Sequence, residues 1–312
     1  MGKFKTVINL LTRNRSMIKK TIGIKFGHSI LSRLFPDKTY LKIQTTLFLD
    51  RSLNLNHPET FNEKMQWLKL NDRNPTYTIM VDKFKAKEYA REIIGDEHII
   101  PTYGCWEKFE DINFDELPER FVLKCNHDSG SVVICKSKKI FDLKMAKAKI
   151  EKGLHTDGYY WGREWPYTNV ERRIIAEEFL HDNKEDDLPD YKVHCFGGVP
   201  KFILVCKDRF SKTGMTEDFY DTNWKSIDVS RPNHKRSSRQ MDRPKWLEEM
   251  LHLSELLSKG IPFLRVDFYV VNEKLYLGEL TLYPASGFEK FVPEEYDALF
   301  GSWIPLPKNK LS

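Results

Sequence analysis

The stretch FLRVDFYVVNEKLYLGELTLYP, residues 263–284, decides the fold, because two runs within it alternate with the period of two that is typical of β-strands. Between the runs, Asn272, Glu273 and Lys274 are predicted to form a three-residue loop, which places Val271 opposite Leu275. In this register one face of the hairpin is almost wholly apolar and can rest on a core. The apolar face is predicted to contain Leu264, Val266, Phe268, Val270, Tyr276, Gly278, Leu280 and Leu282, with Leu275 and Leu277 on the other face.

The other face of the hairpin brings charged side chains together, because Asp267 is placed opposite Glu279 and Arg265 opposite Thr281. Two carboxylates about 5 Å apart across a ladder repel each other unless they share a cation. Oxygen ligands of this kind suit Mg²⁺, which also bridges to phosphates, and Arg265 would donate to the same phosphates. The alternative is that Arg265 simply neutralises two carboxylates on an exposed sheet face.

The composition is that of a globular protein in a reducing environment. The chain has 312 residues, 40% of them hydrophobic and 30% charged, which is enough for two or three subdomains with a core. Its apolar runs fall far short of the roughly 20 residues that a membrane-spanning helix needs, and no secretory signal pattern opens the chain. The five cysteines show no C-x-x-C pairing. We therefore expect a cytoplasmic location.

The positive charge is concentrated at the start of the chain. Residues 1–36 contain eight Lys or Arg and no acidic residue, whereas the remainder contains more acidic than basic residues. The excess is therefore not a nucleic-acid-binding surface spread over the fold, and no nucleic-acid partner is expected. Two alternatives stay open for this arm: it lies on an anionic membrane surface, or it packs on the body as an ordinary helix. Its apolar residues at roughly helical spacing are Val7, Leu11, Ile18, Ile22, Ile30, Leu31 and Leu34.

The rest of the chain predicts a mixture of helices and strands. Residues 37–118 are expected to be helical, with a capping box from Thr60 to Glu63 and a continuous helix from about Thr78 to Ile94. Further predicted elements are strands at 121–126, 132–138 and 173–180, helices at 142–152 and after 244, a hairpin at 191–207 that turns at Gly197 and Gly198, and an irregular region at 211–243.

Residues 124–131, KCNHDSGS, join two strands through small and turn-prone residues. Ser129, Gly130 and Ser131 have no bulky side chain that would keep phosphate oxygens away from the backbone N–H groups. Lys124 and Asn126 share one face of the first strand, so the lysine would reach the same cavity. The spacing differs from that of a P-loop, because no Gly-Lys-Ser/Thr run follows. The alternative is an ordinary hairpin turn.

A second candidate segment is the strand RIIAEEFL, residues 173–180. Backbone groups that leave such a strand can pair with the edge of adenine, and Asp190 further on can accept from ribose hydroxyls. The alternative is a solvated strand end. We find no nucleophilic triad and no histidines at metal-ligand spacing, and His194 is expected to be structural. The candidate residues at the strand end are Glu177, Glu178, Phe179 and Leu180.

The order of these segments resembles that of the ATP-grasp superfamily. FVLKCNHDSGS is similar to its phosphate-covering loop, RIIAEEFL to its adenine hinge, and LRVDF with GELTLYP to its metal-binding strands. Within the superfamily, the chain resembles most the TupA-like branch, which is linked to bacterial surface polysaccharides and capsule biosynthesis. The segments that carry this likeness are HPETFNEKMQWLKLNDRNP, VDKFKAKEYA, YYWGREWPY and DYKVHCFGG, within roughly residues 40–305.

The resemblance implies an ATP-grasp fold of the α+β class, in which two subdomains hold ATP between antiparallel sheets. It implies four parts: a basic arm (1–36), an N-terminal region (37–118), a small subdomain with the phosphate loop (119–180) and a C-terminal subdomain with the metal site (181–312).

The resemblance also implies roles for the candidate residues, with ATP and Mg²⁺ as cofactors. Lys124 contacts the α-phosphate side of ATP, and Arg265 steadies the phosphoryl group in transit. Thr281 stands where the superfamily usually has Asn, and a hydroxyl is a poorer Mg²⁺ ligand than an amide oxygen, so a second ion is in doubt. The other implied contacts are Ser129, Gly130 and Ser131 over the β- and γ-phosphates, Glu177 to Leu180 around adenine, Asp190 at the ribose, and Asp267 and Glu279 on Mg²⁺. Lys192, beside Asp190, has no assigned role.

The implied reaction is an ATP-dependent ligation of a carboxylate to an amine through an acyl phosphate. A uronic acid of a surface glycan and an amino acid are the expected partners, with aromatic rings stacking on sugar faces and a basic cluster holding an anionic substrate. The alternatives for these two groups are core packing and a solvated loop. The candidate substrate residues are Tyr160, Trp161, Arg163, Trp165, Arg236 and Arg239.

Two other functions stay open at this point. One is a phosphotransferase that moves the γ-phosphate to a sugar hydroxyl. The other is a membrane-surface binding protein that has lost catalysis, which the Thr at position 281 favours.

Overall fold

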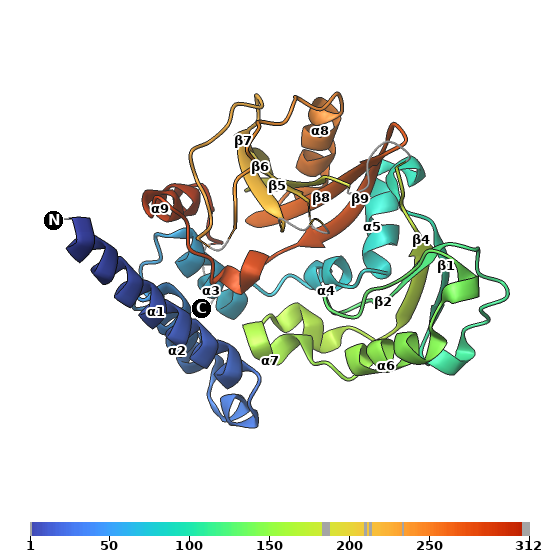
Figure 1. Ribbon diagram of the computed structural model, residues 1–312, viewed down its shortest axis with the longest axis horizontal. Coiled ribbons are helices and arrows are strands. Elements are labelled where there is room, and N and C mark those ends of the chain that lie inside the picture. The colour runs from blue at the N-terminus through green and yellow to red at the C-terminus, as the bar shows by residue number, and fades with distance from the viewer. Residues whose placement is uncertain (1, 183–187, 209–210, 212–213, 233, 308–312) are drawn as a thin grey trace. The chain divides into compact units, whose positions relative to one another are not determined.

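The computed structural model describes residues 2–182, 188–208, 211, 214–232 and 234–307, with side chains from residue 15 onward (Figure 1). The chain forms two compact units. Unit 1 comprises Met1–Arg73, Tyr159–Trp165 and Tyr283–Ser312, and unit 2 comprises Asn74–Gly158 and Pro166–Leu282. The four-part division expected from the sequence stays a prediction. Within the described residues, no helix is both long and apolar enough to cross a membrane.

Unit 1 is helical and is assembled from three pieces of chain. The predicted capping box is confirmed: Thr60 Oγ1 accepts from Glu63 N at 3.3 Å, and the Glu63 carboxylate accepts from Thr60 N at 3.1 Å. Asp297, near the C-terminus, accepts from Asn62 N at 3.1 Å and so joins two of the three pieces. The elements are α1 (Gly2–Gly27), η1 (Ile30–Leu34), α2 (Asp37–Leu49), α3 (Phe61–Asn71), α7 (Gly158–Gly162), η6 (Pro284–Gly287) and α9 (Glu295–Ser302).

A small antiparallel sheet forms the first part of unit 2. Its order is β1 (Thr102–Trp106), β4 (Ile174–Glu178), β2 (Phe121–Cys125) and β3 (Val133–Cys135). The helix α6 (Leu143–Leu154) packs on β2 and β3. Alternating residues of β2 are fully buried against this helix, as the period-two pattern of the sequence requires.

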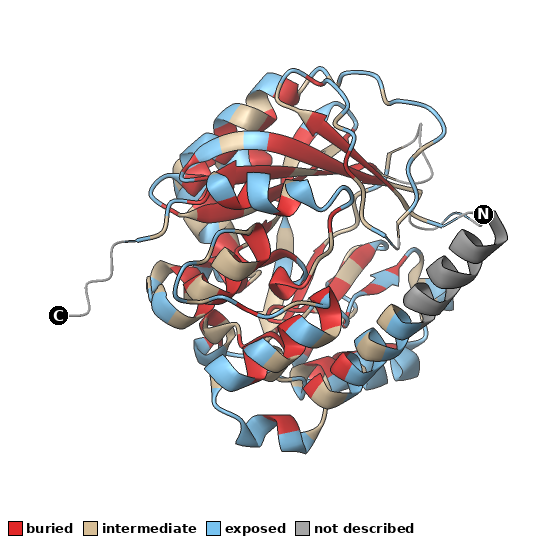
Figure 2. Cartoon of the chain, turned by 90° about the vertical axis from the view of Figure 1, so that its left-hand side faces the viewer, coloured by how far each residue is buried: buried red, intermediate tan, exposed pale blue. Residues whose placement is uncertain are grey.

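A larger antiparallel sheet forms the second part of unit 2, in the order β7 (Thr216–Asp221), β6 (Val199–Lys207), β5 (Asp190–Phe196), β8 (Phe263–Val271) and β9 (Lys274–Thr281). The helix α8 (Leu247–Ser258) packs on its apolar face, and Figure 2 shows buried residues along the strands. The other elements of unit 2 are α4 (Thr76–Val81), α5 (Lys85–Ile94), η2 (Asp96–His98), η3 (Phe109–Asp111), η4 (Lys138–Ile140) and, entering from unit 1, η5 (Trp165–Asn169).

The hairpin β8–β9 confirms the predicted charged pairs through a different turn. The turn has two residues, Asn272 and Glu273, both with positive φ, so Val271 pairs with Lys274 and not with Leu275. A β-bulge between Asp267 and Phe268 then shifts the register by one residue. Asp267 therefore lies opposite Glu279, and Arg265 opposite Thr281, as the sequence predicted.

The bulge corrects the predicted faces of β9. Leu275 and Leu277 pair with Val270 and Phe268, so they belong to the apolar face, and both are buried. Gly278 occupies the bulge because a Cβ there would lie 2.6 Å from the ring of Tyr269.

Three other features differ from the sequence prediction. The helix expected from Thr78 to Ile94 is broken at Asp82, whose carboxylate accepts from Phe84 N at 2.9 Å just before the second helix begins at Lys85. The strands β1 and β7 lie in regions that were predicted to be helical and irregular. Both are edge strands, with weak local patterns that depend on pairing to distant strands.

The bulge yields a first prediction. Gly278→Ala should lower the free energy of unfolding by about 1–3 kcal/mol, because the added methyl group overlaps the Tyr269 ring. Urea denaturation of this variant, of Tyr269→Ala and of the double variant measures the coupling. We expect the alanine at 278 to cost much less once the ring is removed; an equal cost in both backgrounds would contradict the steric account.

Candidate functional site

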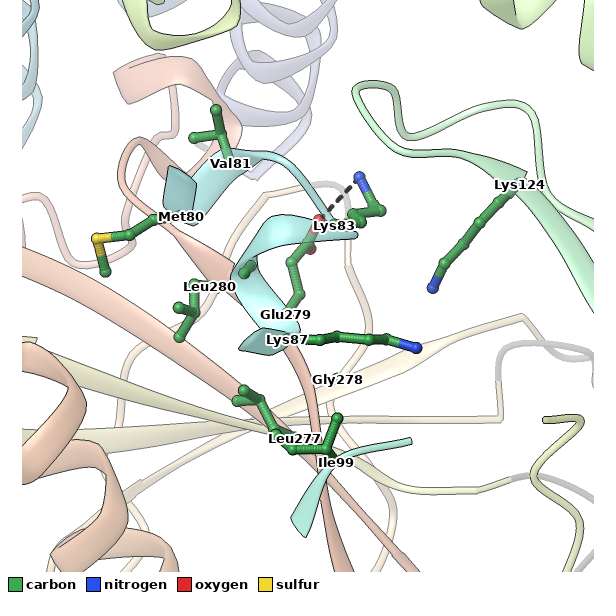
Figure 3. A pocket seen from close by; sticks show the side chains of 11 residues that line it. Met80, Val81, Lys83, Lys87, Ile99, Lys124, Leu277, Gly278, Glu279 and Leu280 are labelled. Atoms are coloured by element: carbon green, nitrogen blue, oxygen red, sulfur yellow. Dashed lines mark ion pairs between the residues drawn. The ribbon is translucent and has the colours of Figure 1, made fainter. Parts of the chain in front are cut away.

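A pocket opens in unit 2 between the charged face of the large sheet and the small sheet (Figure 3). The space among its walls, about 430 Å³ with the open solvent included, is open on one side. Its apolar walls come from α4, β9 and the bridge of Ile99 to Leu277, and its charged residues come from three separate elements. The lining residues are Met80, Val81, Lys83, Ala86, Lys87, Ile99, Lys124, Leu277, Gly278, Glu279 and Leu280.

Three lysines line this pocket, and two of them were missed in the sequence. Lys83 follows the break between α4 and α5, where its Nζ donates to Asp128 O at 2.7 Å and lies 3.4 Å from Glu279 Oε1. Lys87 is one helical turn further on, and in Figure 3 its amino group points toward that of Lys124. The segment VDKFKAKEYA could have indicated both lysines, because Lys83 and Lys87 are four residues apart, a spacing that places two side chains on one face of a helix.

The carboxylate of Glu177 holds two of these lysines in place. Its Oε2 lies 2.8 Å from Lys87 Nζ, and its Oε1 forms an ion pair with Lys124. Burial raises the pKa of the Glu177 carboxyl, but the charges of Lys124 and Lys87 outweigh burial and bring the pKa to about 2. Glu177 was predicted as part of the adenine hinge through its backbone, and the structure gives its side chain a separate role as the counter-ion of the lysines.

A second buried carboxylate, Asp267, lies on the charged face of the large sheet. Arg265 donates to both of its oxygens, at 2.6 Å from Nε and 2.7 Å from Nη2, and Lys192 Nζ lies 2.6 Å from Oδ2. Burial raises the pKa of Asp267, but Arg265 and Lys192 outweigh it and lower the pKa to about 2. Glu279, opposite in the ladder, lies 3.6 Å from Arg265 Nη2.

Lys192 has a defined position that the sequence did not explain. It pairs with Asp267 across the β5–β8 ladder, and its Nζ also lies 2.5 Å from Asp190 Oδ2. Asp190, predicted to accept from ribose, is thus a buried partner of this lysine. His194 is structural as expected, because it is buried and stacks on Phe202 with ring centroids 4.2 Å apart.

The predicted phosphate loop is held by its own hydrogen bonds. Ser131 is buried, accepts from Cys125 N at 2.8 Å and donates to Asp128 Oδ1. Its hydroxyl therefore shapes the loop, which leaves the backbone N–H groups as the candidates for phosphate contact. Ser129 and Gly130 are exposed at the tip.

The predicted adenine hinge follows β4. Glu178 N donates to Pro101 O at 3.0 Å, so this amide is already paired. Phe179 stacks on His181 with centroids 6.0 Å apart, and Leu180 is half-buried. Their backbone groups stay the predicted contacts of the adenine.

Three side chains at the charged face carry oxygen atoms of the kind that bind Mg²⁺. Thr281 Oγ1 is buried and has no hydrogen-bond partner among the described residues, and Glu279 is partly exposed toward the pocket. Asp267 is the third residue with carboxylate or hydroxyl oxygens here. Both of its oxygens already accept hydrogen bonds from Arg265 or Lys192. The described part of the chain has no group of three or more His, Cys, Asp or Glu with metal-site geometry, so water and phosphate would supply the remaining ligands.

Four of the candidate substrate residues belong to unit 1, where packing accounts for them. Arg163 is 2% exposed, and its Nη2 donates to Ser32 O at 2.7 Å. Trp161 packs edge-on against Phe48. Burial leaves the Arg163 side chain unavailable to an anionic substrate, whereas Trp161 is half-buried and its substrate role stays a prediction. The other two are Trp165, whose Nε1 donates to Asp72 O at 2.9 Å, and Tyr160, whose ring lies 4.3 Å from the guanidinium carbon of Arg33.

The basic cluster at 231–243 is largely neutralised by acids of unit 2. Arg236 lies 2.7 Å from Asp228, and Arg231 and Arg243 pair with Glu217 and Glu248. Arg239 is exposed and makes no ion pair with the described residues. The cluster therefore offers an anionic substrate less charge than its sequence suggests.

Comparisons with known proteins give one matching family and several similar solved structures. A model of the family described as TupA-like ATPgrasp matches residues 63–305, whereas a comparison with curated proteins finds no match. The solved D-alanine–D-alanine ligase of Bacillus anthracis is 21% identical, with a TM-score of 0.39 over 65% of this chain and 57% of the ligase. This chain therefore spans less than two thirds of that ligase.

Two further solved structures are similar to the chain. The D-alanine–D-alanine ligase of Helicobacter pylori is 15% identical, with a TM-score of 0.41 over 78% of this chain and 69% of the ligase. A RimK-domain ATP-grasp protein of Sphaerobacter thermophilus is 12% identical, with a TM-score of 0.40 over 74% of this chain and 68% of that protein.

The low pKa of Glu177 makes stability depend on pH. Its folded pKa of about 2 is below the value of roughly 4 in an unfolded chain, so the stabilisation is complete above about pH 4 and is lost as the pH falls toward 2. We expect wild type to exceed Glu177→Gln by about 3 kcal/mol in unfolding free energy near neutral pH, and the gap to close over that window.

Urea unfolding at a series of pH values measures this gap. The matched control is Glu92→Gln, an exposed glutamate on the same helix as Lys87, whose difference from wild type should stay small at every pH. A gap for Glu177→Gln that does not change between pH 4 and 2 would contradict the ion-pair account.

Proposed function

The chain belongs to the TupA-like ATP-grasp family, and from that premise we propose that it is an ATP-dependent carboxylate–amine ligase that forms an acyl phosphate. In this reaction a carboxylate oxygen attacks the γ-phosphorus and ADP leaves, after which the amine attacks the acyl carbon and phosphate leaves. The observation that supports this proposal is the pocket in which Lys83, Lys87 and Lys124 face Glu279. Phosphoryl transfer requires positioning and charge neutralisation, and the pocket has groups for both.

The proposed nucleotide contacts lie on both sheets. Lys124 and Lys87, fixed by Glu177, would donate to the phosphates from the small sheet, with Lys83 beside them. The backbone of Ser129 to Ser131 would cover the phosphates. The backbone of Glu178 to Leu180 would contact adenine, and Asp190 with Lys192 would lie toward the ribose.

ATP-grasp enzymes use ATP with Mg²⁺. Glu279, Thr281 and Asp267 would hold the ion here, and Mg²⁺ supplies neutralisation of the charge on the phosphates when it is bound. Arg265 is held rigidly by its two hydrogen bonds to Asp267, which directs its remaining donors toward the same region. The protein thus contributes fixed cations and an electrostatic environment, with no side chain required as a nucleophile.

The proposed substrates are a glycan or lipid-linked carboxylate, such as a uronic acid, and an amino-acid amine. The link of the TupA-like branch to surface polysaccharides supports this class, and Arg239 is the remaining candidate for contact with it. We place this reaction in the cytoplasm, where ATP is available.

A non-catalytic function has one observation in its favour. Both oxygens of Asp267 accept from Arg265 or Lys192, and Thr281 takes the place of the usual Asn, so the site offers few free metal ligands. Turnover measurements therefore decide between the two functions.

ADP release, measured over uronic acids crossed with amino acids, tests the ligase. Asp267→Asn should reduce turnover at least about a hundredfold, because it removes a charge that positions Arg265 and Lys192. Glu279→Gln, at a partly exposed position, is the second variant if Asp267→Asn folds poorly. Asp115→Asn, an exposed aspartate, is the matched control and should keep full activity. Unchanged turnover in both site variants would contradict the assignment.

Hydroxylamine separates the ligase from a phosphotransferase. In the presence of ATP and the carboxylate, an acyl phosphate is trapped as a hydroxamate, which we expect to detect by mass spectrometry. A phosphosugar in its place would identify a kinase, and ATP binding with no ADP above background for any acceptor would support the non-catalytic function.

A further inference from the structure

We propose that the end of α1 and the turn η1 form a docking surface for an anionic lipid bilayer. This docking surface consists of the exposed apolar residues Met17, Ile18, Ile22, Ile30, Leu31 and Leu34 with the basic residues among them. It belongs to unit 1 and shares no residue with the nucleotide pocket of unit 2.

Three large aliphatic side chains of η1 are exposed to solvent. Ile30 is 70% exposed, Leu31 61% and Leu34 78%, within a helix of five residues. Pale blue in Figure 2 marks the exposed positions of η1 and of the described part of α1. Single exposed leucines are ordinary, but a contiguous group on a short protruding turn is typical of an interaction site.

The outward position of these side chains is fixed by hydrogen bonds on the inner side of the turn. Ser32 is fully buried, and its hydroxyl donates to Ser29 O at 2.8 Å. The buried Arg163 donates to Ser32 O at 2.7 Å and so fixes the turn from the opposite side. Because the turn is rigid, the aliphatic groups need no rearrangement before they enter an apolar phase.

The helix α1 packs on the body along one side. Gly23 and Gly27 are buried against α2, where Gln44 Nε2 donates to Gly23 O at 3.0 Å and a Cβ at Gly23 would lie 2.5 Å from the Phe48 ring. One side of the helix therefore packs on the body as an ordinary helix. The opposite side and flanks leave Met17 60% and Ile18 61% exposed. Val7 and Leu11 lie outside the described side chains.

The charge of this segment selects lipid over a protein partner. Residues 1–36 contain eight basic residues and no acidic one, so the charges of the segment itself favour an anionic surface. Of the described basic residues, Lys19 forms an ion pair with Asp50 of the body. Lys20 and Lys25 are exposed on α1, within the same span as the aliphatic groups. Interfacial helices bind anionic membranes through two interactions: basic side chains are attracted to the headgroups, and aliphatic side chains are buried below them.

Cosedimentation of the full chain with vesicles tests the proposal, without nucleotide or substrate, so that its failure is independent of the ligase reaction. The vesicles are phosphatidylcholine alone, and phosphatidylcholine with phosphatidylglycerol in about equal parts. We expect binding to the anionic vesicles, little to the neutral ones, and a decrease at high salt. Lys20→Gln and Lys25→Gln should each weaken binding about fivefold.

The apolar contribution is tested with Leu31→Ser/Leu34→Ser, which should weaken binding to anionic vesicles at least tenfold because two side chains no longer enter the bilayer. Leu299→Ser, a 44% exposed leucine on α9 of the same unit, is the matched control and should bind as wild type. Circular dichroism confirms that each variant is folded.

Three results would overturn the proposal. The first is no binding to either vesicle, and the second is equal binding by the wild type and the Leu31→Ser/Leu34→Ser variant. The third is self-association of the wild type that this variant abolishes without vesicles, which would make the surface an interface between two copies of the chain.

Discussion

Two buried carboxylates, each held by two cations, are the constraint on which the site depends. Glu177 on the small sheet binds Lys87 and Lys124, and Asp267 on the large sheet binds Arg265 and Lys192. A buried charge without a partner is strongly destabilising, so neither carboxylate can be lost without leaving uncompensated cations. On the small sheet two lysines share one carboxylate, which leaves an excess of positive charge, whereas on the large sheet Asp190 and Glu279 also pair with Lys192 and Arg265. The excess on the small sheet suits a ligand with several negative charges.

The same ion pairs explain how flexible lysine side chains are held in fixed positions. A lysine normally has several rotatable bonds and considerable conformational entropy. Lys87 loses this freedom before any ligand binds, because Ile100 O, Thr102 Oγ1 and Glu177 accept from its Nζ at 2.7–2.9 Å. Lys192 is fixed in the same way between two aspartates. The entropy cost of ordering these groups is therefore met during folding, so that ligand binding does not have to supply it.

The sequence predicted the elements with strong local patterns and missed those that depend on distant partners. The pairing of Asp267 with Glu279 was predicted correctly because the apolar face fixes the register there. The predicted loop was one residue too long, and the bulge at Gly278 offset that difference. The role of Lys192 follows from the pairing of β5 with β8, which no local pattern encodes. Arg163 looked like a substrate residue because burial cannot be read from an arginine in an aromatic segment.

The three-piece construction of unit 1 has a consequence for synthesis on the ribosome. Its first helices are made early, yet Asn62 and Arg51 are paired with Asp297, and Gln66 with the carbonyls of Ser286 and Gly287. These partners are translated more than two hundred residues later. These contacts of Arg51 and of α3 therefore cannot form until nearly the whole chain has left the ribosome, whereas α1 can pack on α2 early. Helix α3 is made early, yet it reaches a part of its native contacts last.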